Sequence, residues 1–347
     1  MDETKTYVDY IAELESVPPY KRFYFGQQEL PWASSALRPP MAKMVWMPAA
    51  SVIDRLRKFE FQNFSVHGRE LLPSPFSQPL IFVSNHVSYM DPPVIGFTIA
   101  KAYGALPWFM AKKRLWDQWS YRWSFPVLGA LPFTRRSTDL DEHIKHLRGF
   151  VSILKANEPL VVYPEGTIPG EIELSKLSLC RLRSEVESAT GLLKGSSLVP
   201  FLAYVSGAKV VPVGISGSGM ILPPEVNPGG IDKPQRKKDH PVVIRFGEPI
   251  DVRSEMVEKF GKTFSETNLA DYANARMMPA ISNLIDFSLH KLPVKLPLSD
   301  EDYKRLREFE METALHYWAK GKNEHGEKIL ERLGATPLMQ EKKSAKA

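Results

Sequence analysis

The stretch "PLIFVSNHVSYMDPPVIGFTIAKAY" (79–103) decides the fold. Its first part, residues 79–85, is a short and nearly continuous apolar run, which is the pattern of a strand buried on both faces. Its last part, residues 91–103, predicts a helix, with Asp91 as the N-cap and Pro92 in the first turn, where a missing N–H group costs little. A buried strand followed at once by a helix is the start of a βα unit.

The same alternation continues along the chain. Further apolar runs predict strands, and segments of ten to eighteen residues between them predict helices. The predicted strands are 107–113, 128–136, 159–166, 209–217 and 241–250, and the clearest predicted helices are 139–156 and 195–208. Strands that alternate with helices favour βαβ units. The sequence therefore predicts an α/β fold: a mixed, mostly parallel sheet flanked by helices, with an N-terminal helical arm and a C-terminal helical extension.

The chain divides on its pattern into three parts. Residues 1–60 are broken by proline pairs and predict a helical arm, residues 61–255 hold the strands, and residues 256–347 predict a helical extension that ends in a disordered basic tail. The arm contains "MVWMPAASVI" (44–53), which is too short to span a bilayer, since a span needs about 20 apolar residues. This segment fits a membrane interface, with Lys43 beside the headgroups, and equally a helix packed on the protein's own core.

Composition and net charge exclude only a few classes of function. With 43% hydrophobic and 24% charged residues, the chain is an ordinary globular protein. A net charge of +5 fits an anionic partner, and it also fits no partner. No zinc-ligand spacing, RNP-like signature or long basic run is present, so we expect no nucleic acid. From the acidic, mixed composition of the first residues we expect neither a signal peptide nor a transit peptide, and the lone Cys180 predicts no internal disulfide.

His86 and Asp91 stand five residues apart in the loop between the first strand and its helix. An aspartate that accepts a hydrogen bond from one imidazole nitrogen leaves the other nitrogen free to act as a base. Taken alone, the pair favours a structural histidine and a helix cap over a catalytic pair. The sequence has no G-x-S-x-G nucleophile elbow, and "GISGSG" (214–219) has its glycines in the wrong places. A base without a protein nucleophile suggests that the substrate supplies the hydroxyl.

Three further stretches also follow apolar runs, where ligands bind in open α/β sheets. They are "LGALPFTRRS" (128–137), "YPEGT" (163–167) and "VVPVGISG" (210–217). Together with "NHVSYMD" and in this order, they resemble the four blocks of the PlsC-like glycerolipid acyltransferase family, whose members include 1-acylglycerol-3-phosphate acyltransferases. The resemblance covers roughly residues 60–255, and its specificity comes from the combination of the blocks.

The resemblance implies an acyl transfer from acyl-CoA or acyl-carrier protein to the hydroxyl of a lysophospholipid, in phospholipid biosynthesis. It makes His86 the general base and Asp91 the residue that orients it. The family's substrate-binding residues match Arg135, with Arg136 beside it, and Glu165, Gly166 and Thr167, while Lys112 and Lys194 are further candidates to approach the phosphate or the acyl carrier. A planar guanidinium suits bidentate contact with phosphate. No metal and no cofactor beyond the acyl donor is implied.

The sequence departs from the family pattern after the glutamate block, which often continues as EGTR but here has Ile168. Either other cations, such as Lys113, compensate, or the acceptor is not simple 1-acylglycerol 3-phosphate. The alternatives are therefore another lysophospholipid or glycerol 3-phosphate as acceptor, hydrolysis of the thioester, or a non-catalytic protein that binds lipid or acyl carrier. The insoluble products predict a peripheral or monotopic protein on the cytoplasmic side of a membrane, with residues 38–58 and 233–238 as contacts.

Overall fold

The computed structural model describes residues 7–20, 23–25, 28–30, 64–88, 90–104, 106–112, 129–133, 140–166, 192, 194–220 and 240–289. The chain divides into two compact units, one of residues 1–166 with 195–291 and one of residues 167–194 with 292–347. Every helix and strand named below belongs to the first unit. Within the ranges just given, no helix has both the length and the apolar character that crossing a bilayer requires.

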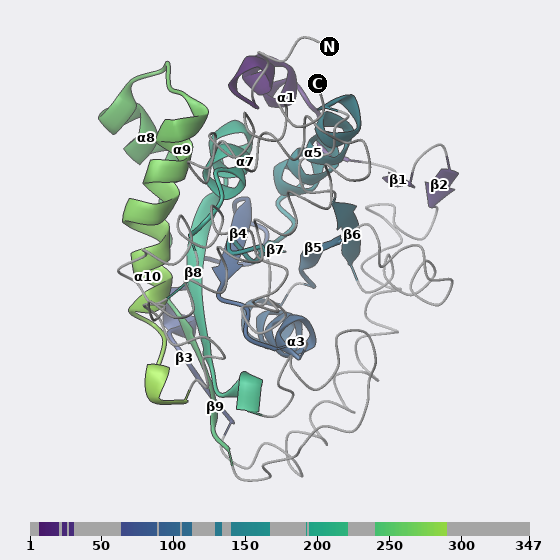
Figure 1. Cartoon of the computed structure of the whole chain (residues 1–347). Helices are drawn as coiled ribbons and strands as arrows, with labels where there is room; N and C mark the ends of the chain where they lie inside the picture. The colour runs from purple at the N-terminus through teal and green to yellow at the C-terminus, as the bar shows by residue number, and fades with distance from the viewer. Residues whose placement is uncertain are drawn as a thin grey trace, which may run out of the picture. The chain divides into compact units, whose positions relative to one another are not determined.

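A seven-stranded sheet forms the centre of the first unit (Figure 1), in the order β3-β9-β8-β4-β7-β5-β6. The strands are β3 (Phe64–His67), β4 (Leu80–Ser84), β5 (Trp108–Lys112), β6 (Ala130–Phe133), β7 (Leu160–Val162), β8 (Lys209–Ser216) and β9 (Val242–Phe246). All neighbours pair in parallel except β8 and β9, which pair antiparallel. This confirms the predicted mixed, mostly parallel sheet.

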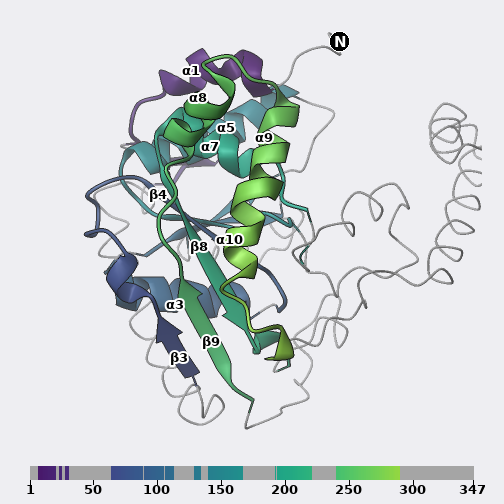
Figure 2. The same cartoon turned by 90° about the vertical axis from the view of Figure 1, so that its left-hand side faces the viewer.

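Helices cover both faces of the sheet (Figure 2). Helix α3 (Asp91–Tyr103) lies on one side, and α5 (Leu140–Lys155) and α7 (Leu198–Ser206) lie on the other. Because both faces are covered, β4 is apolar along most of its length and every residue in it is buried. Pro200 is tolerated in α7 because it stands in the first turn, where its missing N–H has no partner to lose.

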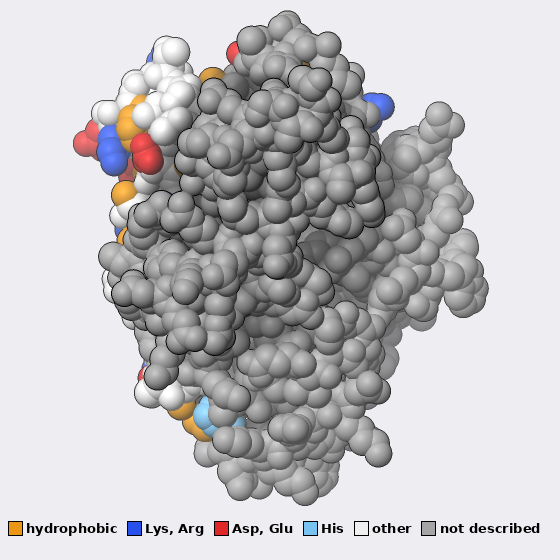
Figure 3. Space-filling view, viewed as in Figure 1, with side chains coloured by type: hydrophobic (Ala, Val, Ile, Leu, Met, Phe, Trp, Pro, Cys, Tyr) orange, Lys and Arg blue, Asp and Glu red, His pale blue; other side chains and the backbone are white. Residues whose placement is uncertain are grey.

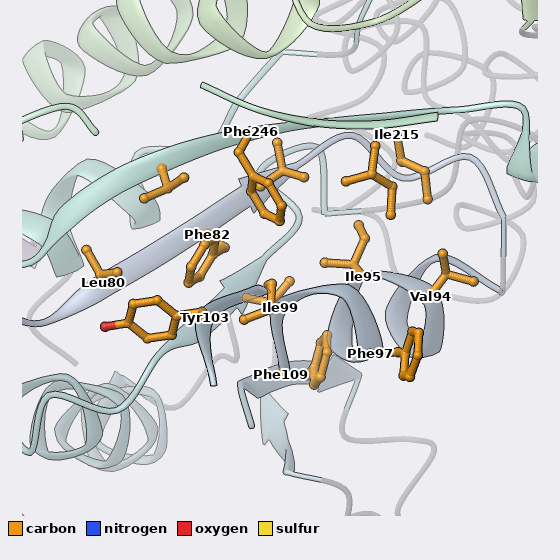
Figure 4. Packing of buried hydrophobic residues seen from close by; sticks show 14 of the residues in the cluster. Leu80, Phe82, Val94, Ile95, Phe97, Ile99, Tyr103, Phe109, Ile215 and Phe246 are labelled. Carbon is orange, nitrogen blue, oxygen red and sulfur yellow. The ribbon is translucent and has the colours of Figure 1, made fainter. Parts of the chain in front are cut away.

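The core on the α3 side is a layer of aromatic and branched side chains (Figure 4). Alternate residues of the strands point to α3, so Leu80 and Phe82 of β4 face Ile95 and Ile99 of the helix. The ring of Phe82 makes edge contacts with Tyr103 and Phe246, at centroid distances of 5.9 and 6.1 Å. This layer fixes the start of α3 relative to the end of β4.

The C-terminal part of the described chain is helical. It consists of α8 (Val252–Phe260), α9 (Glu266–Tyr272), a π-helical turn η9 (Ala273–Met277), α10 (Met278–Ser282) and the 3-10 turn η10 (Phe287–Leu289). Acidic and basic side chains lie side by side over α8 and α9 in Figure 3, as expected for a solvated surface. Residues 290–347, which carry the rest of the predicted extension, lie outside the described residues.

The N-terminal segment differs in part from the helical arm that the sequence predicts. The 3-10 turn η1 (Tyr7–Tyr10) and α1 (Ile11–Glu15) are helical, but β1 (Phe23–Phe25) and β2 (Gln28–Leu30) form an antiparallel pair. Aromatic residues such as the Phe-Tyr-Phe of β1 favour extended backbone. The short 3-10 turn η3 (Arg69–Leu71) follows β3.

Candidate active site

Three neighbouring strands end at the same edge of the sheet. Because β4 is parallel to both β7 and β8, the residues that follow Ser84, Val162 and Ser216 emerge together. These are the loops with "NHVSYMD", "YPEG" and "GSG". Residues 85–88, 90–91, 163–166 and 217–219 therefore form a candidate active site at the carboxyl edge of the sheet.

His86 and Asp91 lie in direct contact. The imidazole Nδ1 is 2.9 Å from Oδ2 of Asp91, and the Asp91 side chain is fully buried whereas 15% of the His86 side chain is exposed. Since an ionised carboxylate only accepts hydrogen bonds, Nδ1 carries the proton and Nε2 carries the free lone pair. This is the arrangement that a histidine general base needs.

Asp91 is held from the loop that precedes it. Its Oδ2 also accepts the backbone N–H groups of Val87 and Ser88, at 2.7 and 2.8 Å. The sequence predicts Asp91 as the N-cap of the following helix, and this prediction is wrong: Asp91 is the first helical residue, and Met90 precedes it without a side-chain cap. The carboxylate bends back over the loop because three N–H donors converge on it there.

Ser218 supplies a fourth hydrogen bond to Asp91. Its hydroxyl donates to Oδ1 of Asp91 at 2.6 Å, and both side chains are fully buried. The turn that carries Ser218 needs Gly217, which has φ of +87° and whose Cβ, if present, would lie 1.9 Å from the carbonyl oxygen of Pro241. Gly217 of "GISGSG" thus allows the turn that brings Ser218 to Asp91.

Asn85 fixes the direction in which β4 leaves the sheet. Its side-chain amide donates to the carbonyl of Ile215 and its side-chain oxygen accepts the N–H of Ile215, both at 2.9 Å. This buried pairing ties the end of β4 to β8 immediately before His86. The asparagine of the "NH" pair therefore acts on the backbone from which the histidine projects.

Glu165 lies next to the histidine from the neighbouring strand. Its Oε1 accepts the backbone N–H of His86 at 3.1 Å, and only 3% of the residue is exposed. Gly166 adopts φ of +65°, a conformation that suits glycine, and its N–H donates to the carbonyl of Tyr163 at 2.9 Å. Sequence analysis predicts substrate-binding roles for both residues; the structure adds a contact through which Glu165 holds the backbone of His86.

Tyr163 was not predicted as a site residue, although it stands at the head of "YPEG". Its ring stacks on the His86 imidazole, with centroids 4.1 Å apart and planes 19° apart. The Tyr163 hydroxyl is buried without a hydrogen-bond partner. Burial, with a smaller contribution from the negative charge of Asp91, raises the pKa of Tyr163 well above its usual value, so the phenol stays neutral.

Asn274, in the π-helical turn η9, holds a segment that runs beside the "YPEG" loop. Its side-chain oxygen accepts the N–H of Gly195 at 2.8 Å, and its amide donates to the Gly195 carbonyl at 3.1 Å. The next residue, Ser196, donates its N–H to the carbonyl of Pro164 at 3.1 Å. π-Helical turns are frequent near functional sites. No sequence motif indicated Asn274.

The other predicted residues are described only in part. Lys194 is half-buried. Lys112 ends β5, and only its backbone is described. The remaining residues named by the sequence analysis lie outside the described residues: Arg135, Arg136, Thr167, Ile168, Lys113, Cys180, Lys43, and the segments 38–58 and 233–238. In the described ranges, no three His, Cys, Asp or Glu side chains converge to hold a metal ion.

Part of the chain matches a known protein family. Residues 63–216 match the model of the Acyltransferase family. This range contains the loops that follow β4 and β7, and it ends at Ser216, directly before the third loop of the candidate site. It also covers nearly all of the four stretches on which the predicted resemblance rests.

Curated relatives of this chain carry specific names. The chain is 26% identical over 165 residues to "1-acyl-sn-glycerol-3-phosphate acyltransferase LPAT1, chloroplastic" of Arabidopsis thaliana, covering 48% of this chain and 39% of that protein. It is also 26% identical over 163 residues to a 1-acyl-sn-glycerol-3-phosphate acyltransferase of Chlamydomonas reinhardtii, covering 47% and 41%. The chain thus spans about two fifths of the length of these relatives.

One solved structure is also similar. The crystal structure of the 1-acyl-sn-glycerophosphate (LPA) acyltransferase PlsC from Thermotoga maritima aligns with a TM-score of 0.42 and 19% identity, over 72% of this chain and 79% of that chain.

Proposed function

We propose that this protein transfers a fatty acyl group from acyl-CoA or acyl-carrier protein to the hydroxyl of a lysophospholipid, with 1-acylglycerol 3-phosphate as the first acceptor to test. The observation that carries the proposal is the hydrogen bond of 2.9 Å between His86 Nδ1 and Asp91 Oδ2. It leaves Nε2 of His86 as a base at the carboxyl edge of an acyltransferase domain. The names of the curated relatives support this acceptor class.

The proposed reaction needs a single base. Nε2 of His86 takes the proton of the acceptor hydroxyl while the hydroxyl oxygen bonds to the thioester carbonyl carbon, which gives a tetrahedral oxyanion. When the oxyanion collapses, the carbon–sulfur bond breaks and the imidazolium returns its proton to the leaving thiolate. Asp91 stabilises the imidazolium between these two steps. A positioned base of this kind contributes about 10²–10⁴-fold in rate.

Phosphate binding in the acceptor is assigned on sequence grounds. We propose that Arg135, with Arg136 beside it, holds the phosphate, with Thr167 and the lysines Lys112 and Lys194 as further contacts. Ile168 in place of the usual arginine keeps glycerol 3-phosphate and other lysophospholipids in the panel of acceptors. Glu165 and Gly166 complete the proposed acceptor site next to His86.

Acyl transfer is tested with the full chain and its His86→Ala variant. Thiol release and the acylated product are measured with acyl-CoA and acyl-carrier protein donors, against 1-acylglycerol 3-phosphate, glycerol 3-phosphate and neutral lysophospholipids. We expect acylated product with at least one pair, and a loss of about 10³-fold or more in His86→Ala. Thiol release that ignores the acceptor would indicate a hydrolase instead, and binding without turnover a non-catalytic protein.

His67→Ala is a matched control for the histidine. His67 ends β3 and is exposed. In the register of the sheet, His67 pairs with Arg245 of β9 and Arg245 pairs with Gly214 of β8, so His67 lies three strands to the side of β4, the strand that leads to His86. His67→Ala should keep full activity. Equal losses in both variants would contradict the assignment of His86 as the base.

We also propose peripheral membrane association on the cytoplasmic side, through the basic residues of 38–58 and 233–238. Each Lys or Arg near an anionic surface adds roughly 1 kcal/mol. Removing residues 1–60 would be a poor test, because α1 packs on α5 and α7. Charge reversal at Lys43, Arg55 and Arg57 leaves α1 in place and should reduce sedimentation with anionic vesicles. Unchanged sedimentation would exclude residues 38–58 as the contact.

A further inference from the structure

The aromatic ring of Tyr163 and the imidazole of His86 form a parallel stack at 4.1 Å between centroids. The short turn that follows β7 holds this contact. Tyr163 directly follows β7, its carbonyl closes the turn to Gly166, and Glu165 in the same turn accepts the backbone N–H of His86 at 3.1 Å. The ring and the carboxylate therefore reach His86 from one short turn, the ring against the imidazole and the carboxylate at the backbone N–H.

The face that Tyr163 presents is neutral and rich in π electrons. Because burial raises the pKa of Tyr163, the phenol does not ionise near neutral pH. The face of a neutral aromatic ring attracts a cation. The imidazole is uncharged before proton transfer and positive after it, so this attraction acts on the protonated state of His86 and adds to that of Asp91.

We propose that Tyr163 is a positioning residue for His86, whose ring face holds the imidazole plane and stabilises the imidazolium formed during acyl transfer. This inference rests on the proposed function. The ring, rather than the hydroxyl, carries the role. The hydroxyl is buried and has no hydrogen-bond partner among the described residues, so its removal breaks no hydrogen bond with them.

Two other charged groups among the described residues contact His86 and can affect its titration. Asp91 approaches from the start of α3, and Glu165 approaches from the turn after β7. Ser218 is a neutral contact of Asp91 from the end of β8. None of these residues changes in the variants below, so a difference between variants reports the ring of Tyr163.

The test compares Tyr163→Phe, which keeps the ring, with Tyr163→Leu and Tyr163→Met, which lose it. The titration of the His86 imidazole is followed by NMR in the full chain, with its signals assigned by their loss in His86→Gln. We expect the His86 imidazole of Tyr163→Phe to titrate as in the wild type. In Tyr163→Leu and Tyr163→Met it should titrate about half a pH unit lower, as the loss of one cation–π contact implies. Met covers the case in which the branched Leu variant does not fold.

Turnover gives the second measurement. We expect kcat of Tyr163→Phe to stay within about twofold of the wild type. For Tyr163→Leu and Tyr163→Met we expect kcat about tenfold below the wild type, with KM little changed. Tyr204→Leu is the control for losing a buried aromatic ring elsewhere. Tyr204 lies in α7 and packs on Phe264. Tyr204→Leu should lower thermal stability without moving the His86 titration.

Two results would overturn the inference. One is a His86 titration in Tyr163→Leu and Tyr163→Met that coincides with that of the wild type. The other is a loss of turnover in Tyr163→Phe as large as that in Tyr163→Leu, which would assign the positioning role to the hydroxyl of Tyr163. The titration requires no substrate, so it tests Tyr163 even if the chain transfers no acyl group. An active wild type with unshifted variants would reject this inference and leave the proposed function standing.

Discussion

Two buried carboxylates lie at opposite edges of the sheet. Asp91, at the carboxyl edge, is fully buried and accepts hydrogen bonds from His86, Ser218 and two backbone N–H groups. Glu158, just before β7 at the amino edge, is 8% exposed and accepts hydrogen bonds from the Tyr20 hydroxyl and the Trp108 indole. Both are satisfied by donors, so burial alone does not distinguish a catalytic carboxylate from a structural one.

The difference lies in the donors. One partner of Asp91 is an imidazole, which takes up and releases protons near neutral pH. The partners of Glu158 are a phenol and an indole, which do not. Tyr20 and Trp108 also pack edge to face at 6.1 Å, and Tyr20 belongs to the N-terminal segment. Glu158 thus joins the N-terminal segment to the sheet, while Asp91 holds the histidine that we propose as the base.

The largest effect on activity in this comparison is expected from Asp91→Asn. An asparagine can keep its oxygen toward the three N–H donors and turn its amide toward the Ser218 oxygen, so the fold should persist. The negative charge that stabilises the imidazolium is lost. We expect kcat to fall about 100-fold or more, with little change in thermal unfolding.

Asp271→Asn is the control for this change, since Asp271 is exposed on α9. It should leave kcat unchanged. A wild-type rate in Asp91→Asn would mean that the charge at the carboxyl edge does no more than the charge of Glu158, and the contrast between the two carboxylates would fail.

A smaller effect is expected from Ser218→Ala. The change removes the hydroxyl that donates to Oδ1 of Asp91 at 2.6 Å, while Oδ2 keeps its three donors. An incompletely satisfied carboxylate positions His86 less well, and we expect kcat to fall about tenfold, in line with the loss of one hydrogen bond to a charged group. Steady-state kinetics across pH 5–9 measure the change.

Ser216→Ala is the matched control, because Ser216 is also a buried serine at the end of β8. Its hydroxyl accepts the N–H of Asp286 at 3.0 Å, and in the part of the chain that the structure describes it forms no hydrogen bond with Asp91. A loss of activity in Ser216→Ala equal to that in Ser218→Ala would show that any disturbance of this strand end suffices, and that the specific bond to Asp91 is not needed.

Much of the carboxyl edge was predictable from local sequence. The continuous apolar run of β4 and the helix over 91–103 are confirmed, because Pro92 allows the helix to begin and Gly104, with φ of +75°, ends it. The pairing of His86 with Asp91 is also confirmed, since only a short loop separates them. These features depend on residues close together in the chain.

The contacts that were missed join residues far apart in the chain. Ser218 reaches Asp91 across 127 residues, and the Asn85 pairing with Ile215 spans 130. No periodicity or spacing within one sequence reports such a meeting. The N-cap prediction for Asp91 failed for a related reason: residue type allows a cap, but three loop and side-chain N–H donors hold the carboxylate elsewhere.

The smallest effect on turnover, and the sharpest contrast, is expected from Glu158. In Glu158→Gln the amide oxygen can accept from Trp108, which only donates, while the amide group donates to the Tyr20 oxygen, which can also accept. Two charge-assisted hydrogen bonds become neutral ones, so we expect the free energy of unfolding to fall by about 1–2 kcal/mol and kcat per folded molecule to stay within twofold.

Glu158→Ala removes both acceptors and should cost about 3 kcal/mol, because it leaves two donors beside a cavity. Chemical denaturation measures stability, and active-site-normalised kinetics measure turnover in the same samples. If Glu158→Gln lowers kcat while its stability stays near that of the wild type, the amino edge is coupled to the base 72 residues earlier in the chain. The two carboxylates would then belong to one functional network, rather than to a catalytic edge and a structural edge.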